Sequence, residues 1–498
     1  MALIQITDLT FAYPGSFDNV FEHVSFQLDT DWRLGLTGRN GRGKTTLLRL
    51  LQGQYPHQGT ITAPGGFEYF PYPVPDASLT PLELLERSFP DVPEWRFRRE
   101  LAPLAVTEDA LYRPFSTLSG GEQAKILLAL LFAREGRYLL IDEPTNHLDE
   151  TGRALVSRYL AKKSGFLLVS HDRAFLDGCV DHILSINRGG IEVQKGNFSS
   201  WYENRQRQDA FELAQNAQLK KEIGRLKQAA RQSRAWADKV ESTKIGPHSA
   251  KVTGEADAMG GRAYIGEQSR RMQQRRKNLE RRQNAAIEEK SALLKNIEQA
   301  APLKLHQLPY HTDRLALLRD VSVCYGGAPV CRGVSFCVEQ GDRIALRGAN
   351  GTGKTSLLRL LCGEDVPHTG TVERSSRLRI SYVRQDPSGL RGDLGAYAAR
   401  YGLDESLFKA ILRKLDFARV QFEKDMADFS AGQKKKVLLA RSLCEPSHLL
   451  VWDEPLNYVD VLSRMQIEDL LLEFQPTIVF VEHDRVFCDH VATKAVML

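Results

Sequence analysis

The sequence predicts an α/β fold in which two tandem domains of the same architecture are joined by an antiparallel α-helical coiled-coil hairpin. Three observations support this prediction. Sequence blocks repeat at a nearly constant offset, strand-like and helix-like segments alternate within each repeat, and a polar stretch of about 100 residues between the repeats lacks that alternation. We place the first domain at residues 1–200, the linker at 201–305 and the second domain at 306–498.

Four sequence blocks of the first domain recur in the second. GRNGRGKTTLLRLL, which begins at Gly38, returns as GANGTGKTSLLRLL at Gly348, and LSGGEQAKILLA at Leu118 returns as FSAGQKKKVLLA at Phe429. IDEPTNHLD and SHDRAF return as WDEPLNYVD and EHDRVF, and the offset stays between 310 and 312 residues throughout. Chance similarity does not keep its spacing over four blocks, so we interpret the two domains as homologous.

Within each repeat, short apolar strands precede amphipathic helices. RLGLTG and RIALRG run into a glycine-rich turn, after which TTLLRLL and TSLLRLL begin helices. YLLID and LLVWD read as buried strands, and FLLVSH and IVFVEH read as the next ones. Continuous apolar strands that alternate with helices are typical of a mainly parallel sheet covered on both faces.

The linker has a different pattern. Trp201–Thr243 and Glu267–Gln299 are polar, contain no proline and carry small or aliphatic residues at alternating four- and three-residue spacing. A glycine-rich stretch, the expected tip at about residues 246–262, separates them. This arrangement indicates two antiparallel helices of about 35–40 residues, each reaching about 50–60 Å.

The positive charge of the chain lies in this linker. Residues 203–300 contain 21 Lys and Arg against 13 Asp and Glu, a net charge of +8, so the overall charge of +5 leaves −3 for the rest of the chain. A basic helical segment in a chain whose remaining residues sum to −3 favours a polyanionic partner such as RNA.

Composition excludes several other classes of protein. The seven cysteines are odd in number and none has CxxC spacing, which argues against disulfides, a zinc ribbon and an iron–sulfur cluster. The apolar runs are shorter than the roughly 20 residues that cross a bilayer, and the N-terminus lacks the pattern of a secretory signal. We therefore expect a cytoplasmic protein without a membrane segment.

Both domains contain a phosphate-binding loop of the form GxxxxGK[ST], at Gly38–Thr45 and Gly348–Thr355. Its backbone N–H groups and its lysine are suited to the phosphates of ATP, and its final hydroxyl is suited to Mg²⁺. The residues expected to bind the nucleotide are Gly38, Asn40, Gly41, Gly43, Lys44, Thr45 and Thr46 in the first domain, and Gly348, Asn350, Gly351, Gly353, Lys354, Thr355 and Ser356 in the second.

A carboxylate ends the next buried strand in each domain. Asp142 and Asp453 stand where they can hold Mg²⁺ together with Thr45 and Thr355. Carboxylate and hydroxyl oxygens are ligands that Mg²⁺ prefers. The sequence therefore predicts a Mg²⁺–ATP site in each half.

The groups needed for hydrolysis follow directly. Glu143 and Glu454 come after the two aspartates, where each can polarise the attacking water. His171 and His483 close the following strand, where an imidazole can contact the γ-phosphate. Phosphoryl transfer depends on positioning and charge stabilisation, which these groups supply.

LSGGE and FSAGQ resemble the signature motif of ATP-binding-cassette proteins, P-loop NTPases whose other motifs match the residues above. In that family each ATP lies between the phosphate-binding loop of one domain and the signature of the other. The resemblance implies that Ser119 and Gly121 face the nucleotide of the second domain, and that Ser430 and Gly432 face that of the first. Both composite sites are then intramolecular, so a monomer is expected.

The same resemblance assigns further residues and reveals two departures. Tyr13 and Tyr325 precede the loops at the place where the family stacks an aromatic ring on adenine, and Gln385 matches its Mg²⁺-sensing glutamine. Tyr72 replaces that glutamine in the first domain, and Ala431 replaces a signature glycine in the second. Both departures belong to the composite site of the first loop, so we expect that site to hydrolyse ATP more slowly.

EPTNHLD, the basic linker and the absence of a membrane segment resemble the ABC-F family of ribosome-binding ATPases. From phosphate-binding loop to signature the two domains span 80 and 81 residues, so no arm is inserted, and the chain looks like the Lsa-type antibiotic-resistance branch. The resemblance implies a ribosomal partner (23S rRNA and peptidyl-tRNA), a linker that points toward the peptidyl-transferase centre, and displacement of lincosamides, pleuromutilins and streptogramin A compounds. The alternatives are a housekeeping ABC-F translation factor, the ATPase subunit of a membrane exporter and a DNA-repair ATPase.

Overall fold

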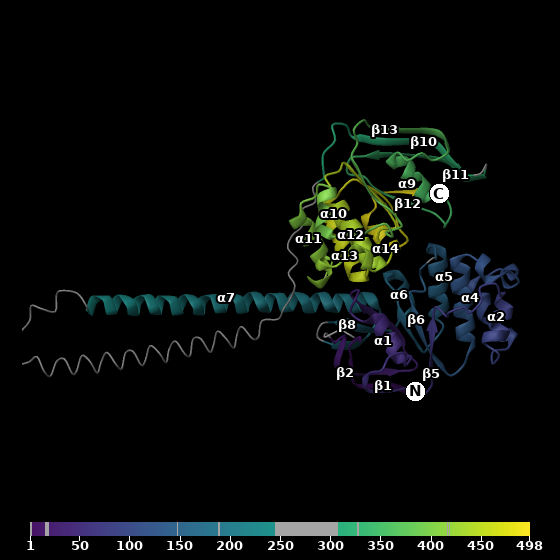
Figure 1. Cartoon of the computed structure of the whole chain (residues 1–498), viewed down its shortest axis with the longest axis horizontal. Coiled ribbons are helices and arrows are strands. Elements are labelled where there is room, and N and C mark those ends of the chain that lie inside the picture. The colour runs from purple at the N-terminus through teal and green to yellow at the C-terminus, as the bar shows by residue number, and fades with distance from the viewer. Residues whose placement is uncertain are drawn as a thin grey trace, which may run out of the picture. The chain divides into compact units, whose positions relative to one another are not determined.

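The fold is seen in a computed structural model that describes residues 2–14, 19–146, 148–187, 190–244, 307–325, 328–415, 417 and 419–498 (Figure 1). The chain divides into two compact units, of which one contains residues 1–201 and 301–498 and the other residues 202–300. The first unit holds both repeats, and each repeat is an α/β domain as predicted.

The central sheet of the first domain has six strands in the order β5-β6-β7-β3-β8-β9. All neighbours run parallel except β8 and β9. The strands are β3 (Arg33–Gly38), β5 (Gly66–Phe70), β6 (Arg137–Asp142), β7 (Phe166–Val169), β8 (His182–Asn187) and β9 (Gly190–Lys195). Every residue of β7 is buried, because helices cover both faces of the parallel part of the sheet.

A small antiparallel sheet and six α-helices complete the described part of the first domain. The sheet has the order β2-β1-β4, with β1 (Leu3–Phe11), β2 (Phe21–Asp29) and β4 (Gln58–Thr62). The helices are α1 (Lys44–Leu51), α2 (Pro81–Ser88), α3 (Glu94–Leu101), α4 (Gly120–Ala133), α5 (Glu150–Leu160) and α6 (Arg173–Cys179).

The second domain repeats this plan. Its central sheet has the order β14-β15-β16-β12-β17 with all pairs parallel, and its small antiparallel sheet has the order β11-β10-β13. The strands are β10 (Arg314–Tyr325), β11 (Ala328–Glu339), β12 (Arg343–Arg347), β13 (His368–Arg374), β14 (Ile380–Val383), β15 (Leu449–Asp453), β16 (Ile478–Val481) and β17 (Lys494–Met497). The helices are α9 (Lys354–Cys362), α10 (Leu394–Arg400), α11 (Glu405–Lys414), α12 (Ala431–Cys444), α13 (Val461–Phe474) and α14 (Arg485–Val491).

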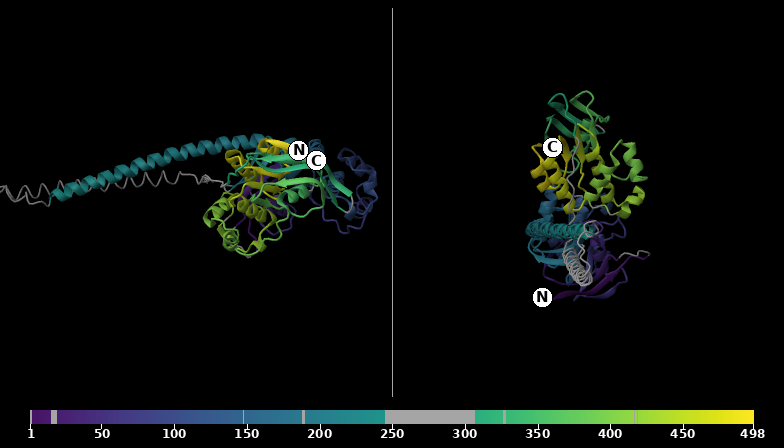
Figure 2. Two further views of the ribbon diagram at one scale, coloured as in Figure 1. Left: turned by 90° about the horizontal axis from the view of Figure 1, so that it is seen from above. Right: turned by 90° about the vertical axis from the view of Figure 1, so that its left-hand side faces the viewer.

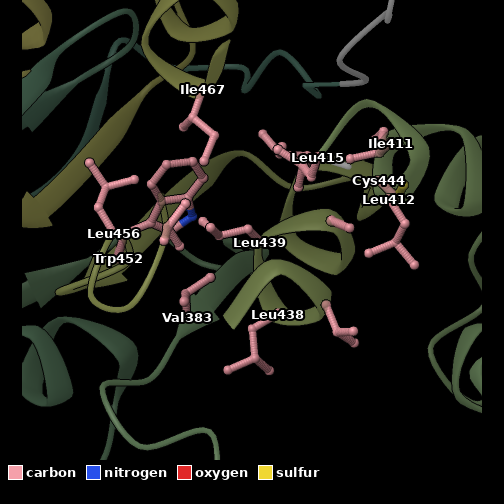
Figure 3. Packing of buried hydrophobic residues seen from close by; sticks show 14 of the residues in the cluster. Val383, Ile411, Leu412, Leu415, Leu438, Leu439, Cys444, Trp452, Leu456 and Ile467 are labelled. Atoms are coloured by element: carbon pink, nitrogen blue, oxygen red, sulfur yellow. The ribbon is translucent and has the colours of Figure 1, made fainter. Parts of the chain in front are cut away.

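The core of the second domain forms where α12 and α13 pack against the central sheet. Trp452 on β15 is fully buried among aliphatic side chains such as Leu439, Leu456 and Ile467 (Figure 3). Its indole N–H donates to the hydroxyl of Ser442 over 2.9 Å, which satisfies the one polar atom of the ring. This packing fixes the end of β15, where the predicted catalytic carboxylates lie.

The linker begins with one long helix. α7 (Phe198–Lys244) contains 47 residues, more than the predicted 35–40, and corresponds to about 70 Å of helix (teal in Figures 1 and 2). Its start is anchored in the first unit, where Phe198 and Trp201 are buried and Ser199 donates to Asp177. The predicted tip and second arm lie outside the described residues. No helix in the described part is both long and apolar enough to span a bilayer.

Candidate active site

The two phosphate-binding loops have the same local geometry. α1 and α9 begin at Lys44 and Lys354, and the preceding Gly43 and Gly353 adopt left-handed φ values of 89° and 83°. A Cβ on Gly43 would lie 2.7 Å from Val20, so glycine is required there for space as well as for conformation. Neither helix has a side-chain cap, which leaves first-turn N–H groups suited to an anion.

Each loop lysine folds back over its own loop. Nζ of Lys44 donates to the carbonyl of Gly38 over 2.6 Å, and Nζ of Lys354 donates to that of Gly348 over 2.8 Å. Burial lowers the pKa of both lysines from the ordinary value. The loop carbonyls and the nearby carboxylates stabilise the ammonium group of each lysine. This ammonium group lies at the loop, where the phosphates of ATP would neutralise its charge.

The two tyrosines assigned to adenine stand beside these helices. The hydroxyl of Tyr13 lies 2.7 Å from that of Thr46, and the hydroxyl of Tyr325 lies 3.0 Å from that of Ser356. Both rings are more than one-third exposed. Large aromatic faces open to solvent next to a phosphate-binding loop are suited to stacking on a base.

The residues expected to hold Mg²⁺ fit a hard cation. Thr45 Oγ1 donates to Asp142 Oδ2 over 3.3 Å, which brings a hydroxyl and a carboxylate together. In the second domain, the buried Asp453 carboxylate lies beside the hydroxyl of Thr355, and burial raises the pKa of Asp453 to about 6. Hydroxyl and carboxylate oxygens are ligands that Mg²⁺ prefers.

The two glutamates lie beside the two histidines. Glu143 Oε1 is 3.2 Å from His171 Nε2, and Glu454 Oε1 is 3.4 Å from His483 Nε2. Both glutamates have left-handed backbones, with φ of 51° and 45°. A non-glycine residue in this conformation is strained by about 1 kcal/mol or more, and its recurrence in both domains shows that the fold imposes it.

The surroundings of the two glutamates differ. Although burial raises the pKa of Glu454, its contacts with His483, Gln385 and Asn457 prevail and lower it to about 2. Burial and the charge of Asp142 instead raise the pKa of Glu143 to about 8. Gln385 Nε2 donates to Glu454 Oε2 over 2.8 Å, so the predicted Mg²⁺-sensing glutamine contacts the glutamate in this structure.

The signature motifs begin helices with the same cap. Ser119 caps α4 and Ser430 caps α12, each accepting a hydrogen bond from the third residue of its helix. Glu122 and Gln433 reach back to complete capping boxes. The motif therefore fixes a helix N-terminus that begins at an exposed serine in each domain.

One cavity brings the signature of the first domain to the phosphate-binding loop of the second. It has a volume of about 1030 Å³, the size expected for a nucleotide-like ligand. From the first domain it is lined by Ser119, Gly121, Asn146, Asp149 and Arg153, and from the second by Asn350, Gly351, Gly353, Lys354, Thr355, Ser356, Gln385, Glu454 and His483. Ser119 and Gly121 thus line the same cavity as the second phosphate-binding loop.

The reciprocal pairing also occurs. Asn40 Nδ2 in the first loop donates to the carbonyl of Tyr458 over 2.8 Å. A Cβ on Gly432 would lie 3.1 Å from the same Asn40 nitrogen and 2.5 Å from the Tyr458 carbonyl, so the second signature approaches the first loop closely. Arg173 of α6 and the buried Glu468 of α13 form a further ion pair between the two domains.

Sequence reasoning missed several residues of these sites. The hydroxyl of Tyr69 donates to Asp142 Oδ2 over 2.9 Å, and Asn457 donates to Glu454. Asn457 recurs as Asn146 in the repeated acidic motif, so the repeat itself carried a signal for it. Tyr69 carried only a weak signal, because an aromatic residue in a strand usually belongs to the core.

Comparisons with known proteins agree with this geometry. The profile of the ABC transporter family matches residues 21–70 and 331–457. The ribosome protection protein VmlR of Bacillus subtilis is 26% identical over 507 residues, covering 99% of this chain and 86% of its own length. ATP-binding protein Uup of Caulobacter vibrioides is 28% identical (96% and 74% covered), and energy-dependent translational throttle protein EttA of Escherichia coli K12 is 24% identical (95% and 88% covered).

Solved structures share the fold. The archaeal ribosome recycling factor aABCE1, in its complex with stalk protein aP1, has a TM-score of 0.63 at 18% identity and covers 98% of this chain, with 87% of its own length matched. RNase-L Inhibitor has the same TM-score and identity, with 99% and 87% covered. At this identity the likeness establishes the tandem-domain architecture and nothing more.

The fold and its paired phosphate-binding loops define a tandem ATP-binding-cassette protein that hydrolyses ATP. The relatives that match nearly the whole chain include a ribosome protection protein and a translational throttle protein, each at less than 30% identity. They include proteins with different named roles, so the Lsa-type resistance branch stays a prediction.

Proposed function

We propose that this chain is a ribosome-associated ATPase that acts in the cytoplasm as a monomer. The observation that carries the proposal is the full-length likeness to a ribosome protection protein and a translational throttle protein, which this chain matches across both cassettes and the segment between them. The basic linker supports it, because neutralisation of phosphates dominates protein affinity for RNA.

Each composite site would bind one ATP. Lys44 and Lys354 would neutralise its phosphates, and Tyr13 and Tyr325 would stack on its adenine. The serines and glycines of the opposite signature would close over it, as the shared cavity at Lys354 suggests. Binding two nucleotides between the domains would draw the domains together.

Hydrolysis would use groups that this chain already positions. Glu143 and Glu454 would orient and polarise the attacking water, while His171 and His483 would hold the glutamates and contact the γ-phosphate. Mg²⁺, when bound by Thr45 and Asp142 or by Thr355 and Asp453, neutralises charge on the phosphates. Gln385 would join the second cation site to Glu454.

The linker would carry the effect of closure to RNA. α7 continues from a start that is anchored in the first cassette, so a movement of that cassette would be transmitted along a rigid helix. By the family resemblance its far end would approach 23S rRNA and peptidyl-tRNA near the peptidyl-transferase centre.

Antibiotic resistance is the role we favour on the ribosome. The likeness to a ribosome protection protein supports a protective role. The Lsa-type resemblance of the sequence adds lincosamide, pleuromutilin and streptogramin A antibiotics as the compounds that would be displaced. A housekeeping translation factor is the second candidate, because the translational throttle protein is similar at nearly the same identity.

Co-sedimentation tests the proposal. The Glu143→Gln/Glu454→Gln double variant should pellet with ribosomes in ATP and not in ADP, and RNase treatment should release it. Wild-type protein expressed in a susceptible host should raise the inhibitory concentrations of the three drug classes. Absence of ribosomes from the pellet would refute the ribosomal role, while ribosome binding without drug protection would favour the housekeeping role.

A further inference from the structure

The two ATP sites differ at the strand next to the acidic motif. Phe70 on β5 pairs with Ile141, and Val383 on β14 pairs with Trp452, so residues two positions further along, Tyr72 and Gln385, are structural equivalents. Gln385 reaches Glu454, whereas Tyr72 turns its ring onto Phe89 with 4.9 Å between centroids. The hydrogen bond from Gln385 to Glu454 in the second site is therefore not reproduced by Tyr72 in the first site.

A different side chain from the same strand enters the first site. The hydroxyl of Tyr69 donates to Asp142 Oδ2 over 2.9 Å, beside the weaker 3.3 Å contact from Thr45. A phenol hydroxyl carries one proton that it can donate to a carboxylate. The hydrogen bond joins a phenol to an ionisable carboxylate, which makes it one of the stronger kinds.

The equivalent tyrosine of the second site makes no such bond. Tyr382 pairs with Val451 as Tyr69 pairs with Leu140, yet within the described part of the chain the Tyr382 hydroxyl makes no hydrogen bond to Asp453. The ring of Tyr382 instead lies under the guanidinium of Arg384, 5.7 Å from its centroid.

The hydrogen-bond donors of the two ATP sites therefore contact different carboxylates. At the Lys354 site they converge on the water-polarising Glu454, which accepts from Gln385 and Asn457. At the Lys44 site they converge on Asp142, which accepts from Tyr69 and Thr45, while Glu143 Oε1 lies 3.2 Å from His171 Nε2. One site orients its catalytic glutamate, and the other orients its cation ligand.

We propose that Tyr69 is a positioning residue that holds the Asp142 carboxylate toward Mg²⁺, and that it makes the Lys44 site a nucleotide-retaining site while the Lys354 site carries turnover. The inference rests on the ATP-site roles proposed above and is independent of the ribosome. Residues that hydrogen-bond to a metal ligand fix its orientation, and their removal lowers metal affinity about 10–100-fold.

The test measures how Mg²⁺ supports nucleotide retention. In full-length Glu143→Gln/Glu454→Gln protein, radiolabelled ATP retained through rapid gel filtration is measured against Mg²⁺ concentration. Adding Tyr69→Phe should raise the Mg²⁺ needed for half-maximal retention about tenfold for one of two bound ATP molecules. Adding Tyr382→Phe, the matched control, should leave both unchanged.

Each outcome decides the matter. A Tyr69→Phe curve that superimposes on the control curve would overturn the proposal, as would an equal shift in both variants. The thermal midpoints should agree between the two tyrosine variants, because phenylalanine preserves both rings. A parent protein that retains no ATP at any Mg²⁺ concentration would refute the proposed ATP-site roles, and this inference with them.

Discussion

A buried ion pair between Lys436 on α12 and Asp460 at the start of α13 offers a quantitative test of the second cassette. Their side chains are 4% and 0% exposed, and the atoms Nζ and Oδ2 are 2.9 Å apart. Lys436 also donates to the carbonyl of Leu415 over 2.7 Å, and Asp460 accepts from the N–H and the hydroxyl of Ser463. Every charged atom of the pair therefore has a partner inside the domain.

Replacing Lys436 by methionine keeps most of the side-chain volume and removes the charge. Asp460 would then be an uncompensated buried carboxylate, and loss of one partner from a buried pair costs about 3–5 kcal/mol. For a domain of this size each kcal/mol lowers the melting temperature by about 2–4 °C. We therefore expect a fall of about 6–20 °C in the transition of the second cassette.

Differential scanning calorimetry of the full chain measures this change. Lys434→Met is the matched control, because Lys434 lies on the same helix and is only partly buried, so the substitution should shift the transition by less than about 2 °C. Lys436→Met/Asp460→Asn should recover part of the loss, since no buried charge remains. Equal shifts for Lys436→Met and Lys434→Met would refute the reasoning.

The same pair predicts a pH dependence. Burial would raise the pKa of Asp460, but Lys436 and the neighbouring hydrogen bonds prevail and hold it well below the ordinary value. A depressed folded-state pKa gives stability that is present above the unfolded pKa and lost as the pH falls through the folded one. The difference between wild type and Lys436→Met should accordingly be largest near neutral pH and shrink in acid.

Three further predictions concern the ATP sites. Glu454→Gln should lower steady-state ATP turnover at least 100-fold and Glu143→Gln less than about threefold, and equal residual rates would contradict the inequality of the sites. Tyr325→Ala should raise the KM for ATP about 5–100-fold while Tyr325→Phe stays near wild type; similar values for both variants would exclude stacking on the base. Gly43→Ala should abolish nucleotide binding at the first loop, as measured by equilibrium dialysis, because its φ is 89° and the added methyl would meet Val20; unchanged binding would show that the loop can relax.

Much of the fold followed from the sequence because the repeated motifs depend on local geometry. A glycine before Lys44 and before Lys354 is demanded by a left-handed backbone, and the aspartates stand where buried strands end. These constraints act over a few residues, so spacing alone locates them. The pairing of Ser119 with the Lys354 site came from a family resemblance, and Ser119 lines the same cavity as the second phosphate-binding loop.

Contacts that depend on tertiary packing were beyond such reasoning. The run of three lysines at 434–436 reads as a solvated helix face, yet Lys435 and Lys436 are buried. They are tolerated because Lys435 donates to the carbonyl of Arg384 and Lys436 to Asp460. Likewise nothing in the strand GFEYF distinguishes Tyr69, whose hydroxyl reaches Asp142 only once β5 and β6 are paired. The α7 helix begins at Phe198, three residues before the predicted arm, and ends at Lys244, one residue after it.

The central claim is that each ATP site is shared between the two cassettes, and a double-mutant cycle on ATP turnover tests it most directly. Ser119 belongs to the first cassette but lines the cavity that contains Lys354 and Glu454. Ser119→Arg should add little to the loss caused by Glu454→Gln, because both disable the same site. Its effect should combine multiplicatively with that of Glu143→Gln, which acts in the other site. If the cycle instead showed that the effect of Ser119→Arg is coupled to that of Glu143→Gln and independent of Glu454→Gln, the shared-site claim would be contradicted.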